Sequence, residues 1–177
     1  QPKADDILIY SEATKESPEV QSAFQLKREE HFPMKIWNYF EFLGELTKYF
    51  RTVGFAGTNG KSSSTSLAIV TGKKMIPELG LGIVGALVPD LNNKSYYLKE
   101  EKQSEFRQLF DFIFTGKKLP YELIKKYYFF LEACEYKRHF LNLDLEYLLI
   151  TNIELDHTDY YRDLADYQSA FVQMNQK

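Results

Sequence analysis

A glycine-rich segment of six residues, GTNGKS at positions 57–62, constrains the fold of this chain more than any other part of its sequence. It follows an apolar, β-favouring run at 51–56 and precedes a Ser/Thr-rich stretch that we expect to be helical as far as about Val70. Glycines let the backbone curl so that successive N–H groups face one anion, and the positive end of the following helix faces the same place. Lys61 adds a charge for phosphate, and Ser62 adds a hydroxyl for Mg²⁺. The segment therefore predicts a phosphate-binding loop of the P-loop type.

One position departs from the strict P-loop pattern, which would place a glycine at position 55, where this chain has Phe55. Gly54 lies one residue too early to replace that glycine. A glycine-rich turn capped by a serine is the plain alternative, but it explains neither Lys61 nor the flanking strand and helix. We expect the lysine to be exposed in the loop. The predicted nucleotide-binding residues are Gly57, Thr58, Asn59, Gly60, Lys61, Ser62 and Ser63.

The order of the predicted elements indicates an α/β fold. Apolar runs typical of strands cover 6–10, 51–56, 127–131 and 147–151. Helical spacing of apolar residues is found over 39–50, 104–115 and 164–174. We also expect helices over 18–26, which follows the helix start at Ser17 and Pro18, and over the Ser/Thr-rich stretch 61–70. The stretch 72–89, punctuated by glycine and proline, is assigned no element. Strands that alternate with helices predict a mainly parallel sheet flanked by helices.

Acidic residues and a histidine follow two of the predicted strands directly. Glu132 comes after the run at 127–131, while Asp156 and His157 come shortly after the run at 147–151. In open α/β sheets, ligands gather beyond the carboxyl ends of the strands. Taken alone, such a carboxylate is often a helix N-cap, and such a histidine is usually a structural polar residue. Beside a phosphate loop, we interpret them as residues that face the phosphates, where ATP chemistry needs Mg²⁺.

Composition excludes several classes of protein. A net charge of −3 over 177 residues lacks the positive charge of a nucleic-acid binder. We find no apolar run near the roughly 18 residues that cross a bilayer, and no signal peptide. The single Cys134 excludes an internal disulfide framework, which favours the cytoplasm, and no histidine base is visibly paired with it. We therefore predict neither a membrane nor a nucleic-acid partner.

Three segments, taken in order, resemble the Mur ligase family. They are GTNGKS at 57–62, EACEYKRHFL at 132–141 and TNIELDHTDYY at 151–161, and the last two are most similar to the alanine-adding members. Upstream, SEAT at 11–14 and SPEV at 17–20 resemble the end of the first domain of such ligases. The resemblance covers nearly the whole chain. It is weakest over about 90–126, where we expect an elaboration particular to this lineage.

The resemblance implies a domain organisation and a reaction. Family members have three domains, so residues 1–50 would be the end of a Rossmann-like domain that binds the UDP substrate, and 51–177 the front of the central ATPase domain. The chain would then be part of a longer enzyme and inactive alone. Alanine-adding members join L-alanine to UDP-N-acetylmuramate through an acyl phosphate. They consume ATP with Mg²⁺, release ADP, and act in peptidoglycan precursor synthesis in the cytoplasm.

The resemblance also implies roles for individual residues. Lys61 would hold the ATP phosphates and Ser62 the first Mg²⁺, while Glu132 and His157 match the metal-binding glutamate and histidine of the family. We therefore predict Lys61 and His157 as catalytic residues, and Ser62, Glu132 and His157 as metal ligands. The alternatives are another Mur-type ligase, such as a murein-peptide recycling ligase or a folylpolyglutamate synthetase, or a non-catalytic phosphate-binding module. TNIELDH gives no support to an ordinary P-loop nucleotide switch.

Several other ligases of the family carry a carbamylated lysine on the helix after the DH motif. Alignment of His157 and Tyr167 with that pattern places Phe171 where this lysine would stand. Phenylalanine cannot form a carbamate, and the apolar spacing of the helix predicts that its ring packs into the core. The resemblance thus implies an enzyme that does not depend on carbamylation.

Overall fold

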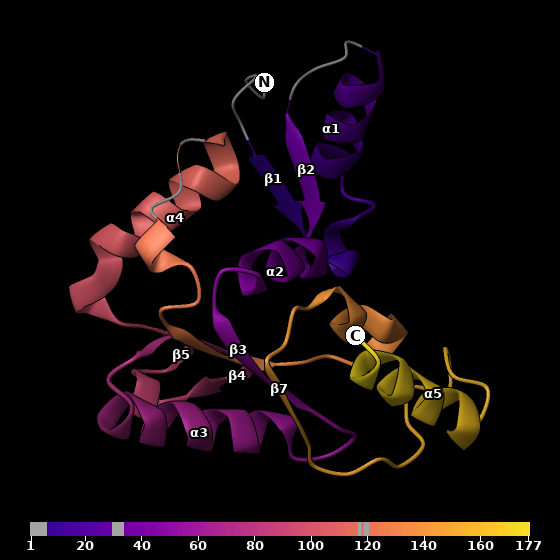
Figure 1. Ribbon diagram of the computed structural model, residues 1–177. Helices are drawn as coiled ribbons and strands as arrows, with labels where there is room; N and C mark the ends of the chain where they lie inside the picture. Colours follow the sequence, from indigo (N-terminus) through magenta and orange to yellow (C-terminus); the bar gives the residue numbers. More distant parts are fainter. Residues whose placement is uncertain (1–6, 30–33, 117, 119–120) are drawn as a thin grey trace.

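Two β-sheets and five α-helices build the part of the chain that the computed structural model describes, residues 7–29, 34–116, 118 and 121–177 (Figure 1). The larger sheet has five strands in the order β5-β4-β6-β3-β7. Its strands are β3 (Arg51–Ala56), β4 (Leu79–Val88), β5 (Lys94–Leu98), β6 (Tyr128–Glu132) and β7 (Tyr147–Ile150). All neighbours pair in parallel except β5, which runs antiparallel to β4. The predicted α/β fold with a mainly parallel sheet flanked by helices is confirmed.

The smaller sheet comes first in the chain and consists of β1 (Ile7–Tyr10) and β2 (Lys35–Asn38), paired in parallel. Helix α1 (Pro18–Glu29) connects them and begins with a proline, whose missing N–H is tolerated at that position. Asp6, which we expected in the first strand, lies outside the described residues. Whether 1–50 belongs to a separate substrate-binding domain stays a prediction.

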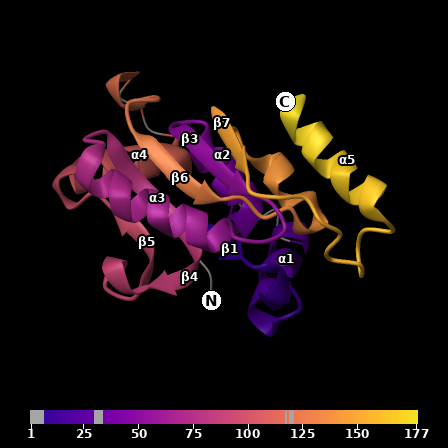
Figure 2. The same ribbon diagram turned by 90° about the horizontal axis from the view of Figure 1, so that it is seen from below.

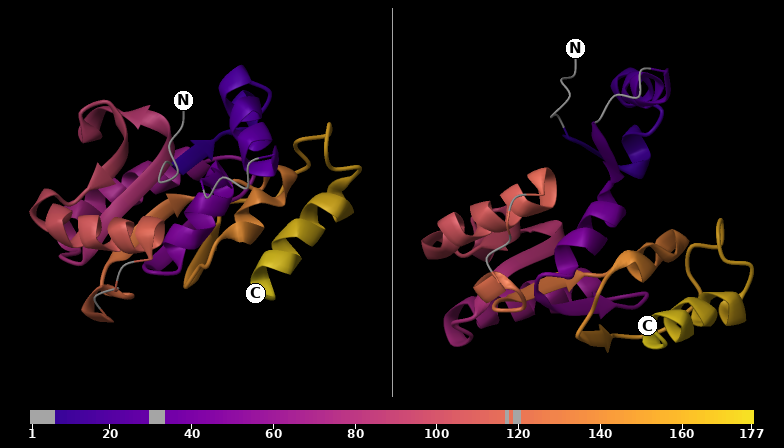
Figure 3. Two further views of the ribbon diagram at one scale, coloured as in Figure 1. Left: turned by 90° about the horizontal axis from the view of Figure 1, so that it is seen from above. Right: turned by 45° about the horizontal axis from the view of Figure 1, so that its top comes forward.

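Helix α2 (Tyr39–Thr47) links the two sheets, as the views in Figure 3 show. It begins at a reciprocal cap: Phe40 N donates to Asn38 Oδ1, and Asn38 N donates to Glu41 Oε2. The helix ends before Tyr49 and Phe50, which we expected on its apolar face and which lie in the following turn. The Phe50 ring is nevertheless buried against the large sheet.

The central sheet is covered on both faces, which gives three layers. Side chains of successive β6 residues alternate between two cores, with Phe129 in one and Phe130 in the other. Helix α3 (Lys61–Met75) packs against Phe130, and Figure 2 shows it lying across the strands. Helices α2 and α4 (Gln103–Thr115) cover the other face, as Figure 1 shows. Helix α5 (Leu164–Asn175) packs on Phe140, in the segment that follows β6.

We assigned no helix or strand to the stretch 72–89 from the sequence, and this was wrong. Helix α3 continues to Met75, past the expected end near Val70, and the ten-residue strand β4 follows. Strand glycines are required here, because a Cβ on Gly80 would lie 2.7 Å from the Phe106 ring and one on Gly82 would lie 2.7 Å from Ile69. No helix of the described residues is both long and apolar enough to span a bilayer.

Candidate functional site

The glycine-rich loop turns sharply from β3 into α3 at two residues with left-handed backbone. Gly57 has φ 126° and Gly60 has φ 82°, values that side chains disfavour. A Cβ on Gly57 would also lie 2.3 Å from Thr151 Oγ1 and 2.7 Å from the Asn152 carbonyl oxygen. Glycine at 57 is therefore needed both for the turn and for the close approach of the segment after β7.

That segment holds the loop through a set of hydrogen bonds. Thr58 N donates to the Asn152 carbonyl oxygen (3.1 Å), and Asn59 N donates to Asn152 Oδ1 (3.1 Å). Thr151 Oγ1 in turn donates to the Asn59 carbonyl oxygen (2.6 Å). Two loop amides that we predicted to face an anion are thus already bonded within the protein. The first turn of α3, which begins at Lys61, keeps the unpaired N–H groups that any helix start offers to an anion.

Ser62 and Glu132 lie together at the start of α3. Ser62 Oγ donates to Glu132 Oε1 across 2.9 Å, and Gly85 N of β4 donates to Glu132 Oε2 across 2.7 Å. The register of β6 against β3 places Glu132 there, because Glu132 pairs with Phe55, the residue before the last one of β3. The structure thus joins two of the three predicted metal ligands.

Lys61 and His157 meet at a different acid, Glu135. Lys61 Nζ lies 2.9 Å from Glu135 Oε1, and His157 Nε2 lies 3.4 Å from the same oxygen. The Lys61 side chain is only 17% exposed, so our expectation of an exposed lysine was wrong; the ammonium folds back onto the loop. His157 has a left-handed backbone (φ 52°), and its backbone N–H donates to Asp156 Oδ1.

Two residues at this centre were not assigned by the sequence. Glu135 lies within EACEY, and only the structure reveals that it is buried and paired with Lys61. Its one signal in the sequence is that it is a second acid, three residues after Glu132. Tyr167 was assigned to the core alone. Its hydroxyl lies 3.1 Å from Thr58 Oγ1 and donates to Glu135 Oε1 at 3.3 Å. Burial raises the pKa of the Tyr167 phenol, so the group keeps the proton that it donates.

The donor chemistry at Ser62 and Glu132 fits Mg²⁺, because a hydroxyl and a carboxylate oxygen are the hard ligands that this ion prefers. His157 is paired with Glu135 instead. Among the described residues, no group of three or more histidine, cysteine, aspartate or glutamate side chains is arranged to hold a metal. A cation bound here would therefore need oxygen atoms from a phosphate or from water to complete its coordination.

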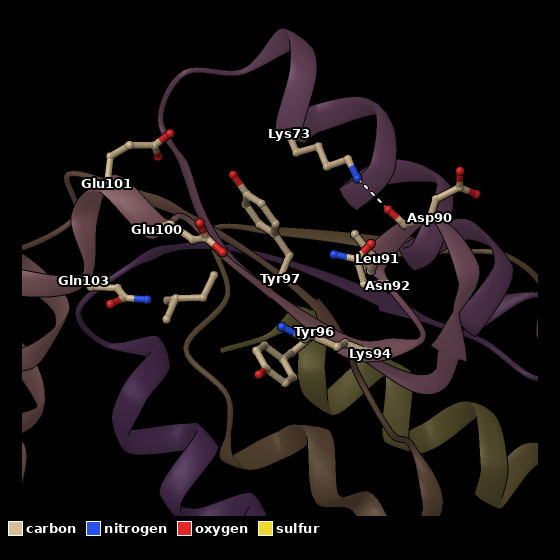
Figure 4. A pocket seen from close by; sticks show the side chains of 11 residues that line it. Lys73, Asp90, Leu91, Asn92, Lys94, Tyr96, Tyr97, Glu100, Glu101 and Gln103 are labelled. Carbon is tan, nitrogen blue, oxygen red and sulfur yellow. Dashed lines mark hydrogen bonds between the residues drawn. The ribbon is translucent and has the colours of Figure 1, made fainter.

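Two other features do not belong to this site. Figure 4 shows the side chains that line a surface pocket; they come from the end of α3, from the β4–β5 hairpin and from the turn that leads into α4. The volume of this pocket is about 380 Å³. Lys73 in its wall lies twelve residues along α3 from Lys61, which is about 18 Å at the rise of a helix. Cys134 lies next to Glu135, but burial raises the pKa of its thiol, which disfavours the reactive thiolate.

The described centre consists of the start of α3, a partly buried lysine and a hydroxyl–carboxylate pair. Comparison with known proteins gives it a context. No model of a protein family matches the chain. The chain is 32% identical over 175 residues to the UDP-N-acetylmuramate–L-alanine ligase of Desulfitobacterium hafniense, and 33% identical over 149 residues to that of Lactiplantibacillus plantarum. These alignments cover 97% and 84% of the chain, but only 31% and 27% of the relatives.

Solved structures show the same fold. The UDP-N-acetylmuramate–alanine ligase of Thermotoga maritima matches 96% of the chain with a TM-score of 0.67 at 19% identity. The UDP-N-acetylmuramate:L-alanyl-γ-D-glutamyl-meso-diaminopimelate ligase of Neisseria meningitides matches 96% with a TM-score of 0.66 at 20% identity. The chain covers 33% and 48% of those structures. It spans between a quarter and a third of the length of the curated relatives that it matches, and over that span it belongs to the Mur ligase family.

Proposed function

We propose that this chain is the nucleotide-binding part of a UDP-N-acetylmuramate–L-alanine ligase. The observation that carries the proposal is the contact of Ser62 Oγ with Glu132 Oε1 at the start of a helix whose first residue is a lysine. The curated relatives support the choice of reaction, because those we compared are named as this ligase. Residues 1–50 would complete the UDP-substrate domain and 51–177 would form the front of the ATPase domain.

The proposed reaction forms one amide bond per ATP. The carboxylate of UDP-N-acetylmuramate takes the γ-phosphoryl group, which gives an acyl phosphate and ADP. The amine of L-alanine then attacks the acyl carbon, the carbon–oxygen bond to phosphate breaks, and the amine loses a proton. Peptidoglycan precursor synthesis in the cytoplasm is the setting that we propose for this step.

The residues of this centre would have distinct roles in the proposed reaction. The first amides of α3 and the Lys61 ammonium would hold the phosphates, because both carry positive charge toward an anion. Ser62 and Glu132 would hold Mg²⁺, which offsets the charge that develops on the transferring phosphoryl group. His157, beside the loop, would act at the same phosphates. Thr151 and Asn152 fix the loop and so preserve this geometry.

The test uses the full-length protein with Mg·ATP, UDP-N-acetylmuramate and a panel of amino acids and peptides. We expect phosphate release that requires both the nucleotide sugar and L-alanine, and a product whose mass equals the sum of the two minus water. Glu132→Gln should abolish most of this activity. Glu146→Gln, a matched change at an acid that pairs with Arg51 at the opposite end of β3, should not.

The alternative reactions give different outcomes in the same assay. Acceptance of an alanyl-glutamyl-diaminopimelate tripeptide in place of L-alanine would identify a recycling ligase. Use of a folate with glutamate would identify a folylpolyglutamate synthetase. No ATP turnover with any acceptor would support a non-catalytic phosphate-binding module. The isolated chain should bind Mg·ATP weakly and form no product, as calorimetry and a phosphate assay would show.

A further inference from the structure

A buried acid, Glu135, contacts both residues that we predict to be catalytic. Its side chain is fully buried, and its Oε1 lies 2.9 Å from Lys61 Nζ and 3.4 Å from His157 Nε2. Tyr167 of α5 donates to the same oxygen. One carboxylate therefore connects the start of α3, the segment after β7 and α5.

The Lys61 ammonium has no donor left for a phosphate in this arrangement. An ammonium carries three N–H donors. Lys61 Nζ bonds to the Gly57 carbonyl oxygen (2.5 Å), the Thr58 carbonyl oxygen (3.1 Å) and Glu135 Oε1. Glu135 supplies the only full negative charge among these three partners. To bind a phosphate, Lys61 must release at least one of them, and the carboxylate is the partner that competes most strongly with an anion.

The carboxylate itself is incompletely satisfied while it holds Lys61. All of its neighbours gather on Oε1, whereas Oε2 is buried without a hydrogen-bond partner among the described residues. A buried oxygen without a partner carries a desolvation cost. His157 Nε2 lies 3.4 Å from Oε1, so a small shift of either side chain would bring the two atoms to an ordinary hydrogen-bond distance. Departure of Lys61 would thus leave Glu135 with a second nitrogen donor close by.

We propose that Glu135 is a positioning residue that exchanges partners during nucleotide binding. It holds Lys61 Nζ against the loop before the nucleotide arrives, and it holds His157 Nε2 once Lys61 has turned to the phosphates. A carboxylate that pairs with one ring nitrogen fixes the orientation of an imidazole and leaves Nδ1 for a ligand. The catalytic part of this inference rests on the proposed function, whereas the binding part requires only that the protein binds a nucleotide.

The exchange predicts two opposite effects when the charge of Glu135 is removed. Nucleotide binding becomes tighter, because the phosphates no longer compete with a carboxylate for Lys61. Turnover becomes slower, because the His157 ring loses the group that orients it. A residue that only supported the fold would change both quantities in the same direction or leave both unchanged.

The experiment compares full-length wild type, Glu135→Gln and the control Glu146→Gln by calorimetry with ATP, in the presence of Mg²⁺ and again with EDTA. For Glu135→Gln we expect the Kd for ATP to fall about fivefold in both conditions, since a charge-assisted hydrogen bond is replaced by a neutral one. We expect kcat for alanine-dependent phosphate release to fall about 10- to 100-fold, as for other residues that orient an active-site histidine. Glu146→Gln should leave both within roughly twofold, because its ion pair with Arg51 is at the surface.

An unchanged or higher Kd in a folded Glu135→Gln protein would overturn the proposal, and melting curves establish that the variant is folded. If Glu135→Gln does not fold, Glu135→Asp decides, because it keeps the charge but draws the carboxylate back from both Lys61 and His157. We expect a Kd for ATP no higher than that of the wild type and a turnover about tenfold slower; weaker ATP binding or wild-type turnover would overturn the exchange. Should the wild type lack alanine-dependent turnover, the proposed function fails, while the calorimetric result still decides whether Glu135 competes for Lys61.

Discussion

Ser62 Oγ donates a hydrogen bond to Glu132 Oε1 across 2.9 Å, which joins the first turn of α3 to the end of β6. The two residues are seventy positions apart in the sequence, and the parallel pairing of β3 with β6 brings them together. Both groups offer oxygen atoms, and no basic side chain is hydrogen-bonded to either of them within the described part of the chain. This pair is therefore the point at which the proposed Mg²⁺ dependence is best tested.

Ser62→Ala removes the hydroxyl and leaves the helix intact, since alanine is the strongest helix former. We expect the Mg²⁺ concentration that gives half-maximal turnover to rise about tenfold or more, because one hard ligand is lost. Titration of phosphate release with Mg²⁺ at saturating ATP measures this. Ser66→Ala, one turn further along α3, is the control and should keep the wild-type Mg²⁺ dependence. An unchanged Mg²⁺ response in Ser62→Ala would remove Ser62 from the metal site.

Gly85→Ala should disturb the same site from the β4 side. A Cβ at this position would lie 3.1 Å from each oxygen of the Glu132 carboxylate, which is closer than an ordinary contact. The carboxylate must then shift from the Gly85 N–H and from Ser62. We expect turnover to fall about tenfold with the fold retained, as for other losses of a group that orients a metal ligand. Circular dichroism and phosphate release measure the two effects, and wild-type turnover would show that the carboxylate does not need this position.

Lys61→Ala should lower both turnover and stability. Loss of a charge-stabilising group commonly costs about 10²–10³ in rate. The variant also leaves Glu135 buried without its cation, which costs on the order of 3 kcal/mol. The double variant Lys61→Ala/Glu135→Gln removes both charges, so we expect its melting temperature to recover while its turnover stays low. Near-normal turnover in either variant would contradict the role of Lys61.

Glu105 of α4 makes a pH-sensitive contact with the residues directly before β6. Glu105 accepts hydrogen bonds from Lys102, Lys126 and Tyr127. The bond from Lys102 is the main cause that lowers the pKa of Glu105 from 4.5 to about 2. Because the folded-state pKa is the lower one, the stabilisation is complete above 4.5 and disappears as the pH falls toward 2.

Glu105→Gln should therefore lower the melting temperature at pH 7 and have a progressively smaller effect between pH 4.5 and pH 3. The contact is partly exposed, so its contribution is about 1 kcal/mol or less. Thermal melts of wild type and variant across this range provide the measurement. A difference that does not depend on pH would show that packing, rather than charge, explains the effect.

The sequence predicted the elements whose signals are local. Apolar runs marked β3, β6 and β7, and the glycine-rich segment between β3 and α3 identified the loop. Strand β4 was missed because LGLGIVGALV contains three glycines, which usually weaken a strand. Only the tertiary structure explains two of them, since the Phe106 and Ile69 side chains fill the space beside Gly80 and Gly82.

The sequence predicted only part of the centre of the site, because the missing part likewise depends on the tertiary structure. The motifs drew attention to Lys61, Ser62, Glu132 and His157, and the structure places all four beside the loop but in two separate groups. The importance of Glu135 follows from its complete burial among groups from α3, α5 and the segment after β7. No local pattern encodes which of two acids in EACE faces the lysine.

Phe171 provides the last prediction, because the resemblance to the family places it where several other ligases would carry a carbamylated lysine. Its side chain is buried, and its ring packs edge-on against Phe140 and Tyr167 at centroid distances of 5.3 Å each. No carbamate can form on this side chain. Activity of the full-length protein should therefore be the same after exhaustive removal of bicarbonate as in its presence. A bicarbonate requirement, or a carbamate found by mass spectrometry on Lys177 of the segment after α5, would show that another lysine supplies this group.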